Sequence, residues 1–426
     1  MRNMKDSGIE WIGEIPENWE VKPIKQILCE RKESNNPIKS DFILSLTNDR
    51  GVIPYHTKGD VGNKSKEDIT GYKLVYPNDI VLNSMNVVIG SVGLSNYFGL
   101  VSPVYYMLYT RNKKDNIKYF NYIFQSKEFQ GKLKGYGNGI MDIRMRIPMS
   151  KLNTVLIPLP SEDEQTLIAD YLDNKVNEID NIISKTQETI EEYKKYKQSV
   201  ITEAVTKGLN PNVEMKDSGI EWIGEIPKHW EIQNLNQIFY QLKNKNNDLI
   251  EQNLLSLSYG NIVRKDINSK EGLLPENFSG YNIIDKGDIV LRLTDLQNDH
   301  TSLRTGLAKE RGIITSAYIT LRSKESSNTG YFHLYLHSFD IYKGFYGMGS
   351  GIRQNLTYDG IKYLKVLVPP LKERQEISDF CNSKIRKIDN LITKKQELIT
   401  QLESYKKSLI YEYVTGKKEV AVAYGY

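Results

Sequence analysis

Cysteine and histidine are scarce in this chain of 426 residues, which contains two cysteines and five histidines. Cys29 and Cys381 lie in unrelated sequence contexts, so we expect no disulfide framework, and a cytoplasmic location fits this cysteine usage. The scattered histidines offer no metal-binding spacing. Long apolar runs are also missing: none approaches the roughly 18–20 residues of a membrane span, and the N-terminus has no apolar segment typical of a signal peptide.

Catalytic motifs are absent as well. There is no GxxxxGK[ST] phosphate-binding loop, since residues 415–418 read only TGKK. There is no Asn-Pro-Pro-aromatic motif of an adenine methyltransferase and no glycine-rich cofactor fingerprint. We therefore expect a chain that is not an enzyme by itself. Its net charge of +4 permits nucleic-acid binding without requiring it.

What the chain does contain is a long internal repeat. Residues 4–16 read MKDSGIEWIGEIP, and residues 215–227 repeat these letters without a change. Further along, a constant offset of 209 links Gly71 to Gly280, Asp79 to Asp288, Arg144 to Arg353 and Asp180 to Asp389. Solenoid repeats recur every few tens of residues, so this is a whole module used twice.

Each copy begins with a mixed segment of about 150 residues that is typical of an α/β (α+β) domain with short strands. Strands are predicted at 43–46, 79–82 and 101–109 in the first copy and at 254–257, 288–291 and 313–321 in the second. Helices are predicted at 119–129 and 331–342. Glycine-rich loops follow at 135–139 and 344–351. The segments 83–99 and 292–312 share almost nothing, although the strands before them match.

Each copy ends with a charged segment that has strict helical periodicity. In the first, apolar positions alternate in steps of four and three through Leu172, Val176, Ile179, Ile183, Thr186, Ile190, Tyr193, Lys197, Val200 and Ala204. In the second, they run through Cys381, Ile385, Ile388, Ile392, Lys395, Ile399, Leu402, Lys406, Leu409 and Tyr413. This pattern predicts coiled-coil helices of roughly 60 Å, with Gly208 and Gly416 as C-caps.

We expect each helix to pair with the other. The first is rich in acidic residues and the second in basic residues, which favours pairing between them over self-pairing. A pseudo-twofold relation of the two copies would make the pair antiparallel. The alternative is that each helix packs onto its own globular domain. Polar seam residues such as Lys197 and Lys406 either fix the register or extend to solvent.

All four tryptophans lie in the repeated N-terminal segments, as Trp11, Trp19, Trp222 and Trp230. This placement indicates packing, and we expect the segment to seat each module against the end of a helix. Docking of a partner protein is the alternative.

These features resemble the specificity subunits of type I restriction-modification systems. The junction from Leu209 through MKDSGIEWIGEIPKHWE at 215–231 is similar to the junction before the family's second module. The stretch LIPLP at 156–160, with Glu164-Gln165 and Ile168-Ala169, resembles the family's helix entry. The second entry, VPPL at 368–371, departs from this pattern by one deleted residue and by Ser378, which leaves the start of that helix in doubt. The resemblance covers essentially the whole chain.

The resemblance implies a non-catalytic subunit with two target-recognition domains, at 1–158 and 209–367. It also implies a central coiled-coil helix at 159–208 and a C-terminal coiled-coil helix with a tail at 368–426. Each domain would read one half of a bipartite double-stranded DNA target, and the helices would set the spacer and dock two methyltransferase subunits. Restriction subunits would join for cleavage. This chain would bind no cofactor, and S-adenosylmethionine, ATP and Mg²⁺ would be used by the other subunits.

Candidate DNA contacts are basic and amide side chains in the divergent loops, because such groups reach base edges and phosphates. In the first copy they are Asn83, Ser84, Asn86, Arg144 and Arg146. In the second copy they are Arg292, Thr294, Arg304, Arg353, Gln354 and Asn355. There are two structural alternatives. The divergent loops could differ only because their sequences are unconstrained, and Arg144 and Arg353 could form structural salt bridges.

Two other functions stay open from the sequence. One is a self-contained DNA methyltransferase or nuclease with two DNA-reading domains, against which the missing cofactor motifs argue. The other is a coiled-coil scaffold that never binds DNA.

Overall fold

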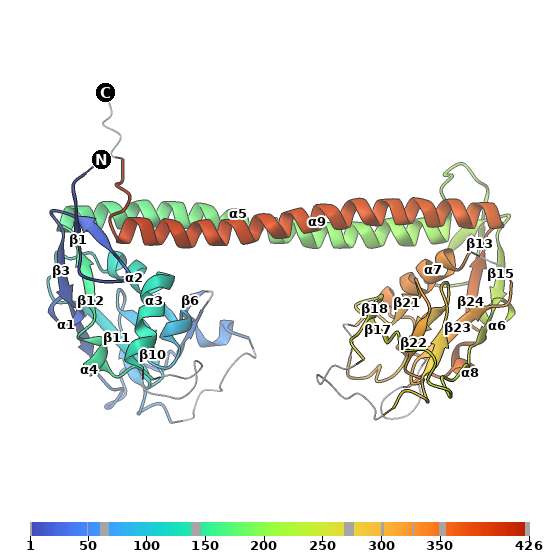
Figure 1. The fold of residues 1–426 in the computed structure, drawn as a ribbon, viewed down its shortest axis with the longest axis horizontal. Coiled ribbons are helices and arrows are strands. Elements are labelled where there is room, and N and C mark those ends of the chain that lie inside the picture. Colours follow the sequence, from blue (N-terminus) through green and yellow to red (C-terminus); the bar gives the residue numbers. More distant parts are fainter. Residues whose placement is uncertain are drawn as a thin grey trace. The chain divides into compact units, whose positions relative to one another are not determined.

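The computed structural model describes residues 2–48, 50–59, 68–137, 146–267, 277–299, 302–325, 328–348 and 355–421. The chain divides into two compact units (Figure 1): unit 1 comprises Met1–Gln187 and Gln396–Tyr426, and unit 2 comprises Glu188–Lys395. Each unit therefore holds one globular part and a stretch of each long helix, α5 (Glu162–Lys207) and α9 (Leu371–Val414). Among the described residues, no helix is both long and apolar enough to cross a bilayer.

The globular part of unit 1 is built around a four-stranded antiparallel sheet. Its strand order is β4 (Leu28–Arg31), β11 (Tyr105–Thr110), β8 (Ile80–Asn83) and β9 (Val92–Leu94). Two-stranded pairs surround it: β1 (Met4–Asp6) with β2 (Glu14–Pro16), β3 (Glu20–Pro23) with β12 (Leu156–Leu159), β5 (Leu44–Thr47) with β6 (Gly51–Pro54), and β7 (Lys73–Val75) with β10 (Gly99–Val101). The short helices are α1 (Ile24–Ile27), α2 (Ile117–Gln125), α3 (Lys127–Leu133) and α4 (Met149–Leu152), with 3₁₀ turns η1 (Tyr55–Thr57), η2 (Val87–Ile89) and η3 (Lys134–Tyr136).

Unit 2 repeats this plan. Its four-stranded sheet has the order β16 (Phe239–Gln241), β23 (Ile319–Ser323), β20 (Ile289–Leu291) and β21 (Thr305–Leu307). The matching pairs are β13 (Met215–Asp217) with β14 (Glu225–Pro227), β15 (Glu231–Asn234) with β24 (Lys365–Val368), β17 (Leu255–Ser258) with β18 (Asn261–Arg264), and β19 (Asn282–Ile284) with β22 (Gly312–Ile314). The short helices are α6 (Leu235–Ile238), α7 (Thr329–Ile341) and α8 (Tyr358–Ile361). The predicted fold of two homologous α/β domains with two long helices is confirmed.

Three predicted elements are each divided in the structure. The strand expected at 101–109 splits into β10 and β11, because a turn closed by the Tyr105 N–H and the Ser102 carbonyl (3.0 Å) redirects the chain into a different sheet. The strand expected at 313–321 splits into β22 and β23 through the equivalent turn. The helix expected at 119–129 is α2 followed by α3, because Ser126 is extended (ψ 132°) and its hydroxyl accepts from the Phe129 N–H as a new N-cap.

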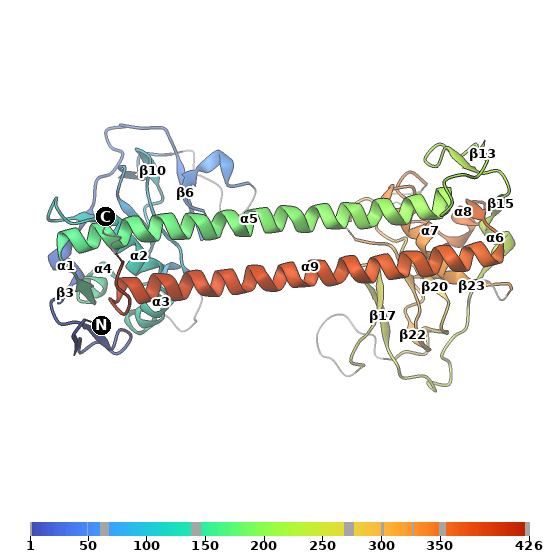
Figure 2. The same ribbon diagram turned by 90° about the horizontal axis from the view of Figure 1, so that it is seen from above.

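Within each unit, α5 and α9 lie side by side and run in opposite directions (Figure 2). In unit 1, Lys406 Nζ lies 2.6 Å from Asp180 Oδ1, and the Tyr171 and Tyr413 rings contact each other at 4.6 Å. In unit 2, Lys197 Nζ lies 2.6 Å from Asp389 Oδ1. As the residue number increases along α5, the number of its contact partner on α9 decreases. The predicted antiparallel pair is therefore confirmed.

The two ion pairs are repeat-equivalent, since Asp180 and Lys197 correspond to Asp389 and Lys406 at the offset of 209. The lysine side chains are 30% and 31% exposed, so each pair contributes at most about 1 kcal/mol. The ion pairs instead specify the register of the two helices, because a slip of one heptad would separate each seam lysine from its carboxylate. The polar seam residue Thr186 is buried, and its hydroxyl donates to the Ile182 carbonyl (2.7 Å).

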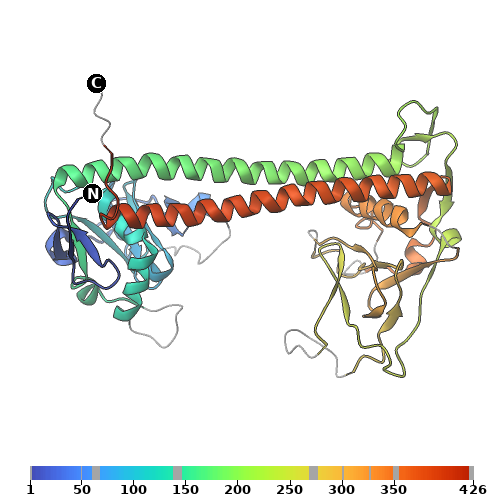
Figure 3. The same cartoon turned by 45° about the horizontal axis from the view of Figure 1, so that its top comes forward.

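The apolar seam also serves the globular parts, which pack against both helices (Figures 1 and 3). None of the twenty seam positions predicted on the two helices is exposed. In unit 1 a single core joins Leu172 and Ile179 of α5 to Leu409 of α9 and to the globular side chains. In unit 2 Ala204 and Cys381 are joined in the same way. Interhelical pairing and packing onto the globular part, considered as alternatives from the sequence, occur together.

Each unit receives the C-terminal end of one long helix in a pocket that we call the helix-end socket. The socket consists of Pro16, Trp19 and Tyr119 in unit 1 and of Pro227, Trp230 and Tyr331 in unit 2. The Tyr119 hydroxyl donates to the Val414 carbonyl (2.9 Å), and the Tyr331 hydroxyl donates to the Val205 carbonyl (3.0 Å). These carbonyls belong to the last helical turn and lack partners within the helix.

The caps that follow these helix ends require glycine. Gly208 has φ +77° and Gly416 has φ +72°, the left-handed conformation of a helix C-cap, as predicted. A Cβ on Gly416 would lie 2.4 Å from Pro16 Cδ and 3.0 Å from the Trp19 ring. The tryptophan segment thus seats helix ends, as expected for Trp19 and Trp230.

Candidate nucleic-acid interface

In unit 1, three segments meet beyond the carboxyl end of β8. They are the β5–β6 turn, residues 84–91 and residues 146–147, which we call loop cluster 1. The turn approaches through Gly51, whose Cα would lie only 2.9 Å from a Cβ built on Gly93 of β9. The Ile147 N–H donates to the Ser84 carbonyl (2.9 Å) and so ties the exit of the glycine-rich loop to the end of β8.

Loop cluster 1 places the predicted DNA contacts unequally. Ser84 is fully buried and its hydroxyl donates to the Val104 carbonyl (2.9 Å), while the Asn83 side chain is buried and accepts from the Met85 N–H (3.0 Å). This burial argues against the base contacts predicted for them, because both side chains are used to shape the loop. Asn86 is half-buried and Arg146 is exposed. Arg144 lies outside the described residues.

In unit 2, the equivalent segments meet beyond the end of β20. They are the β17–β18 turn, residues 292–299 with 302–304, and residues 355–356, which we call loop cluster 2. Leu303 contacts the turn, since a Cβ on Gly260 would lie 3.0 Å from it. The Asn355 side chain accepts from the Asp295 N–H (2.7 Å), and the Leu356 N–H donates to the Leu293 carbonyl (2.9 Å).

Arg304 holds loop cluster 2 together from inside. Its side chain is fully buried and donates to the Thr294 carbonyl (3.0 Å) and to the Asp299 carbonyl. Its backbone N–H donates to Asp340 Oδ2 (2.6 Å). A buried guanidinium that donates to loop carbonyls cannot also reach a base edge, so the DNA contact predicted for Arg304 is not supported.

The other predicted residues of loop cluster 2 remain accessible to different degrees. The Arg292 side chain is 35% exposed and lies 3.8 Å from Asp299 Oδ2. Thr294 is half-buried, whereas Asn355 is exposed. Arg353 and Gln354 lie outside the described residues, so their contacts stay predictions.

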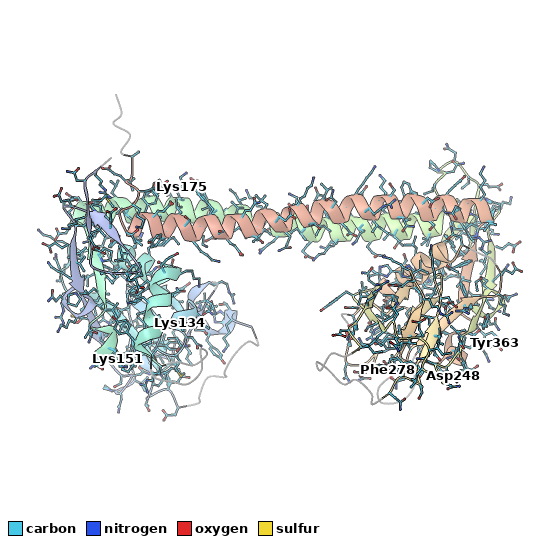
Figure 4. The ribbon with its side chains drawn as sticks, in the orientation of Figure 1. Lys134, Lys151, Lys175, Asp248, Phe278 and Tyr363 are labelled. Atoms are coloured by element: carbon cyan, nitrogen blue, oxygen red, sulfur yellow. The ribbon has the colours of Figure 1, made fainter. Side chains whose placement is uncertain are left out.

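The sequence alone did not draw attention to the tips of the two hairpins. Arg50, in the β5–β6 turn, is exposed and donates to the Thr57 carbonyl (3.1 Å). Tyr259, in the β17–β18 turn, is 86% exposed. The available signal was two short strands separated by a few turn residues, of which only the first strand was recognised in each copy. Lys134, exposed just before the glycine-rich loop of unit 1, is a further accessible cation (Figure 4).

At the opposite end of the sheets, the repeated aspartates have a structural role. Asp79 accepts two hydrogen bonds from Arg31 (2.8 and 3.0 Å), and Asp288 accepts two from Arg322 (2.8 and 2.6 Å). These bonds raise the pKa of both guanidinium groups. Arg31 lies on β4, whereas Arg322 lies on β23, so neighbouring strands supply the arginine in the two copies.

Comparisons with known proteins agree with this architecture. Residues 16–192 match the family model described as the type I restriction modification DNA specificity domain. The chain is 25% identical, over 96% of both lengths, to a putative type I restriction enzyme MjaX specificity subunit of Methanocaldococcus jannaschii. It is also 25% identical to the MjaVIII specificity subunit of that organism, over 95% of this chain and 94% of the relative. Over nearly its whole length the chain is thus similar to specificity subunits of type I restriction-modification systems.

Solved structures show the same fold at low sequence identity. A chain from a study of complex assembly and conformational transition in the type I R-M system has a TM-score of 0.69 at 11% identity, covering 95% of this chain and 99% of that one. The HsdS subunit from Thermoanaerobacter tengcongensis has a TM-score of 0.52 at 12% identity, covering 95% and 98%.

The helix start that the family pattern left in doubt is settled by the structure. α9 begins at Leu371 and α5 begins at Glu162, which are repeat-equivalent at the offset of 209. The departure at Ser378 is accommodated by packing, since Ser378 is buried and a Cβ on Gly330 would lie 2.7 Å from its hydroxyl.

Helix α7 supports loop cluster 2, and two histidines and one aspartate on it have shifted pKa values in the acidic range. Burial lowers the pKa of His333 to about 3 and of His337 to about 4, with added repulsion from His337 and from Lys197 respectively. Burial raises the pKa of Asp340 to about 6. Unfolding between pH 6.5 and 4 therefore binds protons on both histidines and releases one from Asp340.

We expect unit 2 to lose stability as the pH falls from 7 to 5. The depressed histidine pKa values remove stability as the pH drops below 6.5, and Asp340 restores part of it, which leaves a net loss of about 2 kcal/mol. Urea unfolding at the two pH values measures it. His337→Gln should reduce the loss by about three quarters, because one histidine contribution is removed while that of Asp340 remains. An unchanged pH dependence in this variant would contradict the assignment.

Proposed function

We propose that this specificity subunit reads a bipartite, asymmetric double-stranded DNA target, one half with each globular part. The observation that supports this is the contrast between frame and loops. Helix-end sockets, sheets and interhelical ion pairs recur at equivalent positions, whereas the loop clusters share no chemistry. Cluster 1 contains the η2 turn and Arg50, and cluster 2 is built around the buried Arg304 with Tyr259 at its edge. Two different readers on one frame suit two different half-sites.

DNA binding by the complex with its methyltransferase subunits tests this proposal. We expect salt-sensitive binding to a duplex that carries the target, since phosphate neutralisation dominates affinity and its logarithm falls linearly with the logarithm of the salt concentration. Binding that is absent, or that does not respond to salt, would favour a scaffold without DNA contact. Methylome sequencing of a host that expresses the complex would supply the target.

The chain would carry no methyltransferase or nuclease activity of its own. Among the described residues, no group of three or more His, Cys, Asp or Glu side chains is placed to hold a metal ion. S-adenosylmethionine, ATP and Mg²⁺ would be used by the methyltransferase and restriction subunits. Methyl transfer by the purified chain alone, measured with labelled S-adenosylmethionine, would instead support the self-contained enzyme.

The paired helices would set the spacer between the two half-sites. Inserting one heptad after Gln187 and one after the equivalent Gln396 adds about 10 Å of helix, because each residue contributes 1.5 Å. We expect the spacer to grow by about three base pairs at 3.4 Å each, while both half-sites stay unchanged in the methylome.

A single insertion is the matched control for this experiment. One heptad added to α5 alone cannot satisfy the Asp180–Lys406 and Lys197–Asp389 pairs in one register. This variant should lose helix pairing and stability rather than gain a longer spacer. An unchanged spacer in the double insertion would contradict the ruler role.

The same helices offer a repeated surface for two methyltransferase subunits. Four apolar residues each immediately precede a seam residue and are 44–53% exposed: Ile182 and Tyr405 in unit 1, and Leu391 and Tyr196 in unit 2. Ile182 corresponds to Leu391 and Tyr196 to Tyr405 at the offset of 209. An exposed apolar pair that recurs in each unit suits one copy of the same partner per unit.

Charge substitutions in this surface should remove partner subunits one at a time. We expect Ile182→Lys to release one methyltransferase subunit and Ile182→Lys with Leu391→Lys to release both, as measured by native mass spectrometry. Asn181→Lys, an exposed neighbour on α5, is the control that should keep both subunits. Retention of both subunits by the double variant would place the docking surface elsewhere.

A further inference from the structure

The β17–β18 hairpin ends in a two-residue turn with an unusual first residue. Ser258 pairs with Asn261, which leaves only Tyr259 and Gly260 in the turn. Their φ angles are +46° and +77°. Turns of this kind strongly prefer Asn-Gly, Asp-Gly or Gly-Gly, because both central residues occupy left-handed conformations. A tyrosine in this position is strained.

The strain at Tyr259 is not compensated by packing. The residue is 86% exposed, more than any other large apolar or aromatic residue described as exposed. A bulky ring that is held in a disfavoured conformation and left in solvent contributes nothing evident to folding. Such outliers concentrate at functional sites.

The turn is held at the edge of loop cluster 2. Gly260 fits closely against Leu303, with 3.0 Å from a built Cβ to the Leu303 side chain. Leu303 directly precedes the buried Arg304, whose guanidinium fixes residues 294–299. β18 also contacts β21, the strand that follows this loop (Figure 1). The ring of Tyr259 therefore projects from a braced position beside the segments expected to meet DNA.

The corresponding turn in unit 1 differs in both length and chemistry. Thr47 pairs with Gly51 across a three-residue loop, and this loop carries the exposed Arg50. The strands of the two hairpins match in the repeat, but their tips do not. This is the pattern expected of a position that reads sequence rather than one that supports the frame.

We propose that the tip of the β17–β18 hairpin is a further DNA-contacting element, and that Tyr259 places its ring against a base-pair step of the half-site read by unit 2. This rests on the proposed DNA-reading function. An aromatic ring can pack on a thymine methyl group or wedge between base steps, and its hydroxyl can bond to an acceptor at a base edge. A ring contact of this kind contributes specificity and carries no charge.

The substitution Tyr259→Asn separates this role from a structural one, because the two predict opposite signs. Asn-Gly is the preferred sequence for this turn, so the variant should keep its fold and raise Tm by about 2 °C or more. We expect its affinity for the target duplex to fall about tenfold, as measured with the full complex and the target identified by methylome sequencing. Wild-type affinity in Tyr259→Asn would overturn the proposal.

Salt dependence and the methylome give two further readouts. Tyr259→Asn should leave the slope of log K against log salt unchanged. The comparison variant is Lys265→Ala, which removes an exposed cation just beyond β18. It should lower the slope by about one if that lysine neutralises a phosphate. A lower slope in Tyr259→Asn would overturn the uncharged ring contact. In the methylome, Tyr259→Asn should relax the half-site of unit 2 alone. A wild-type complex that shows no salt-sensitive binding would sink the proposed function itself, an outcome distinct from a failure of Tyr259→Asn.

Discussion

Replacing residues 4–160 with residues 215–369 should convert the asymmetric target into a symmetric one in which the half-site of unit 2 occurs twice. The exchange keeps the frame, because the incoming segment supplies Trp230 and Tyr331 where Trp19 and Tyr119 receive the end of α9. Pro369 also takes the place of Pro160 before α5. The incoming segment brings the complete domain with loop cluster 2, so the host methylome should show two copies of one half-site in inverted orientation.

The reciprocal exchange is the matched control for this experiment. Residues 4–160 in place of 215–369 should yield a symmetric target made of the other half-site. Methylation of the original asymmetric target by either chimera would contradict the assignment of one half-site to each globular part. A chimera that fails to fold or to assemble would instead show that the two helix-end sockets are not equivalent. Circular dichroism would detect the loss of fold, and native mass spectrometry would detect the loss of assembly.

Trp230→Ala should destabilise unit 2 by about 3–5 kcal/mol, and Trp19→Ala should do the same to unit 1. Both indole rings are fully buried and pack edge-on against the socket tyrosines, with ring centroids 6.4 Å apart in each case. Truncation of such a side chain removes its transfer free energy and leaves a cavity beneath the helix end. Amide hydrogen exchange measures the loss locally, since protection should fall first in the unit that carries the substitution.

Phenylalanine substitutions sharpen this result. The Trp19 indole N–H donates to Glu164 Oε2 (2.7 Å), whereas the Trp230 indole N–H is buried without a hydrogen-bond partner among the described residues. Trp19→Phe should therefore cost more than Trp230→Phe. Tyr196→Ala, on the exposed flank of α5, serves as a control that should leave stability nearly unchanged. Equal effects of Trp230→Ala and Tyr196→Ala would refute the socket.

The long helices and their pairing were predictable because their signal is long-range and redundant. A seam that alternates four and three residues over more than four heptads leaves little freedom, and Gly208 and Gly416 fix the ends. The register of the two helices was harder to predict, because Lys197 and Lys406 could equally well extend to solvent. Only their placement 2.6 Å from Asp389 and Asp180 shows that they are interhelical partners.

The candidate interface could be proposed from the sequence as a region, and its contact with DNA stays a prediction. Divergence after β8 and β20 drew attention to these loops, yet Ser84 and Arg304 point inward, since a loop of this size needs buried donors to satisfy its own carbonyls. No periodic pattern marks which polar residue performs this task. Tyr259 was missed for the converse reason: tyrosine in a hairpin usually indicates a strand, and only its positive φ reveals a turn.

The exchanged arginines at Asp79 and Asp288 limit how this protein can be re-engineered. Since Arg31 reaches its carboxylate from β4 and Arg322 reaches its own from β23, equivalent positions in the two copies no longer hold interchangeable side chains. Grafting an arginine at Leu242, the counterpart of Arg31, would direct two guanidinium groups at Asp288 and leave neither well paired. Point transplantation between the copies is therefore unsafe even where the backbones match. The smallest segment that can be exchanged between the copies is the complete domain together with its own internal ion pair.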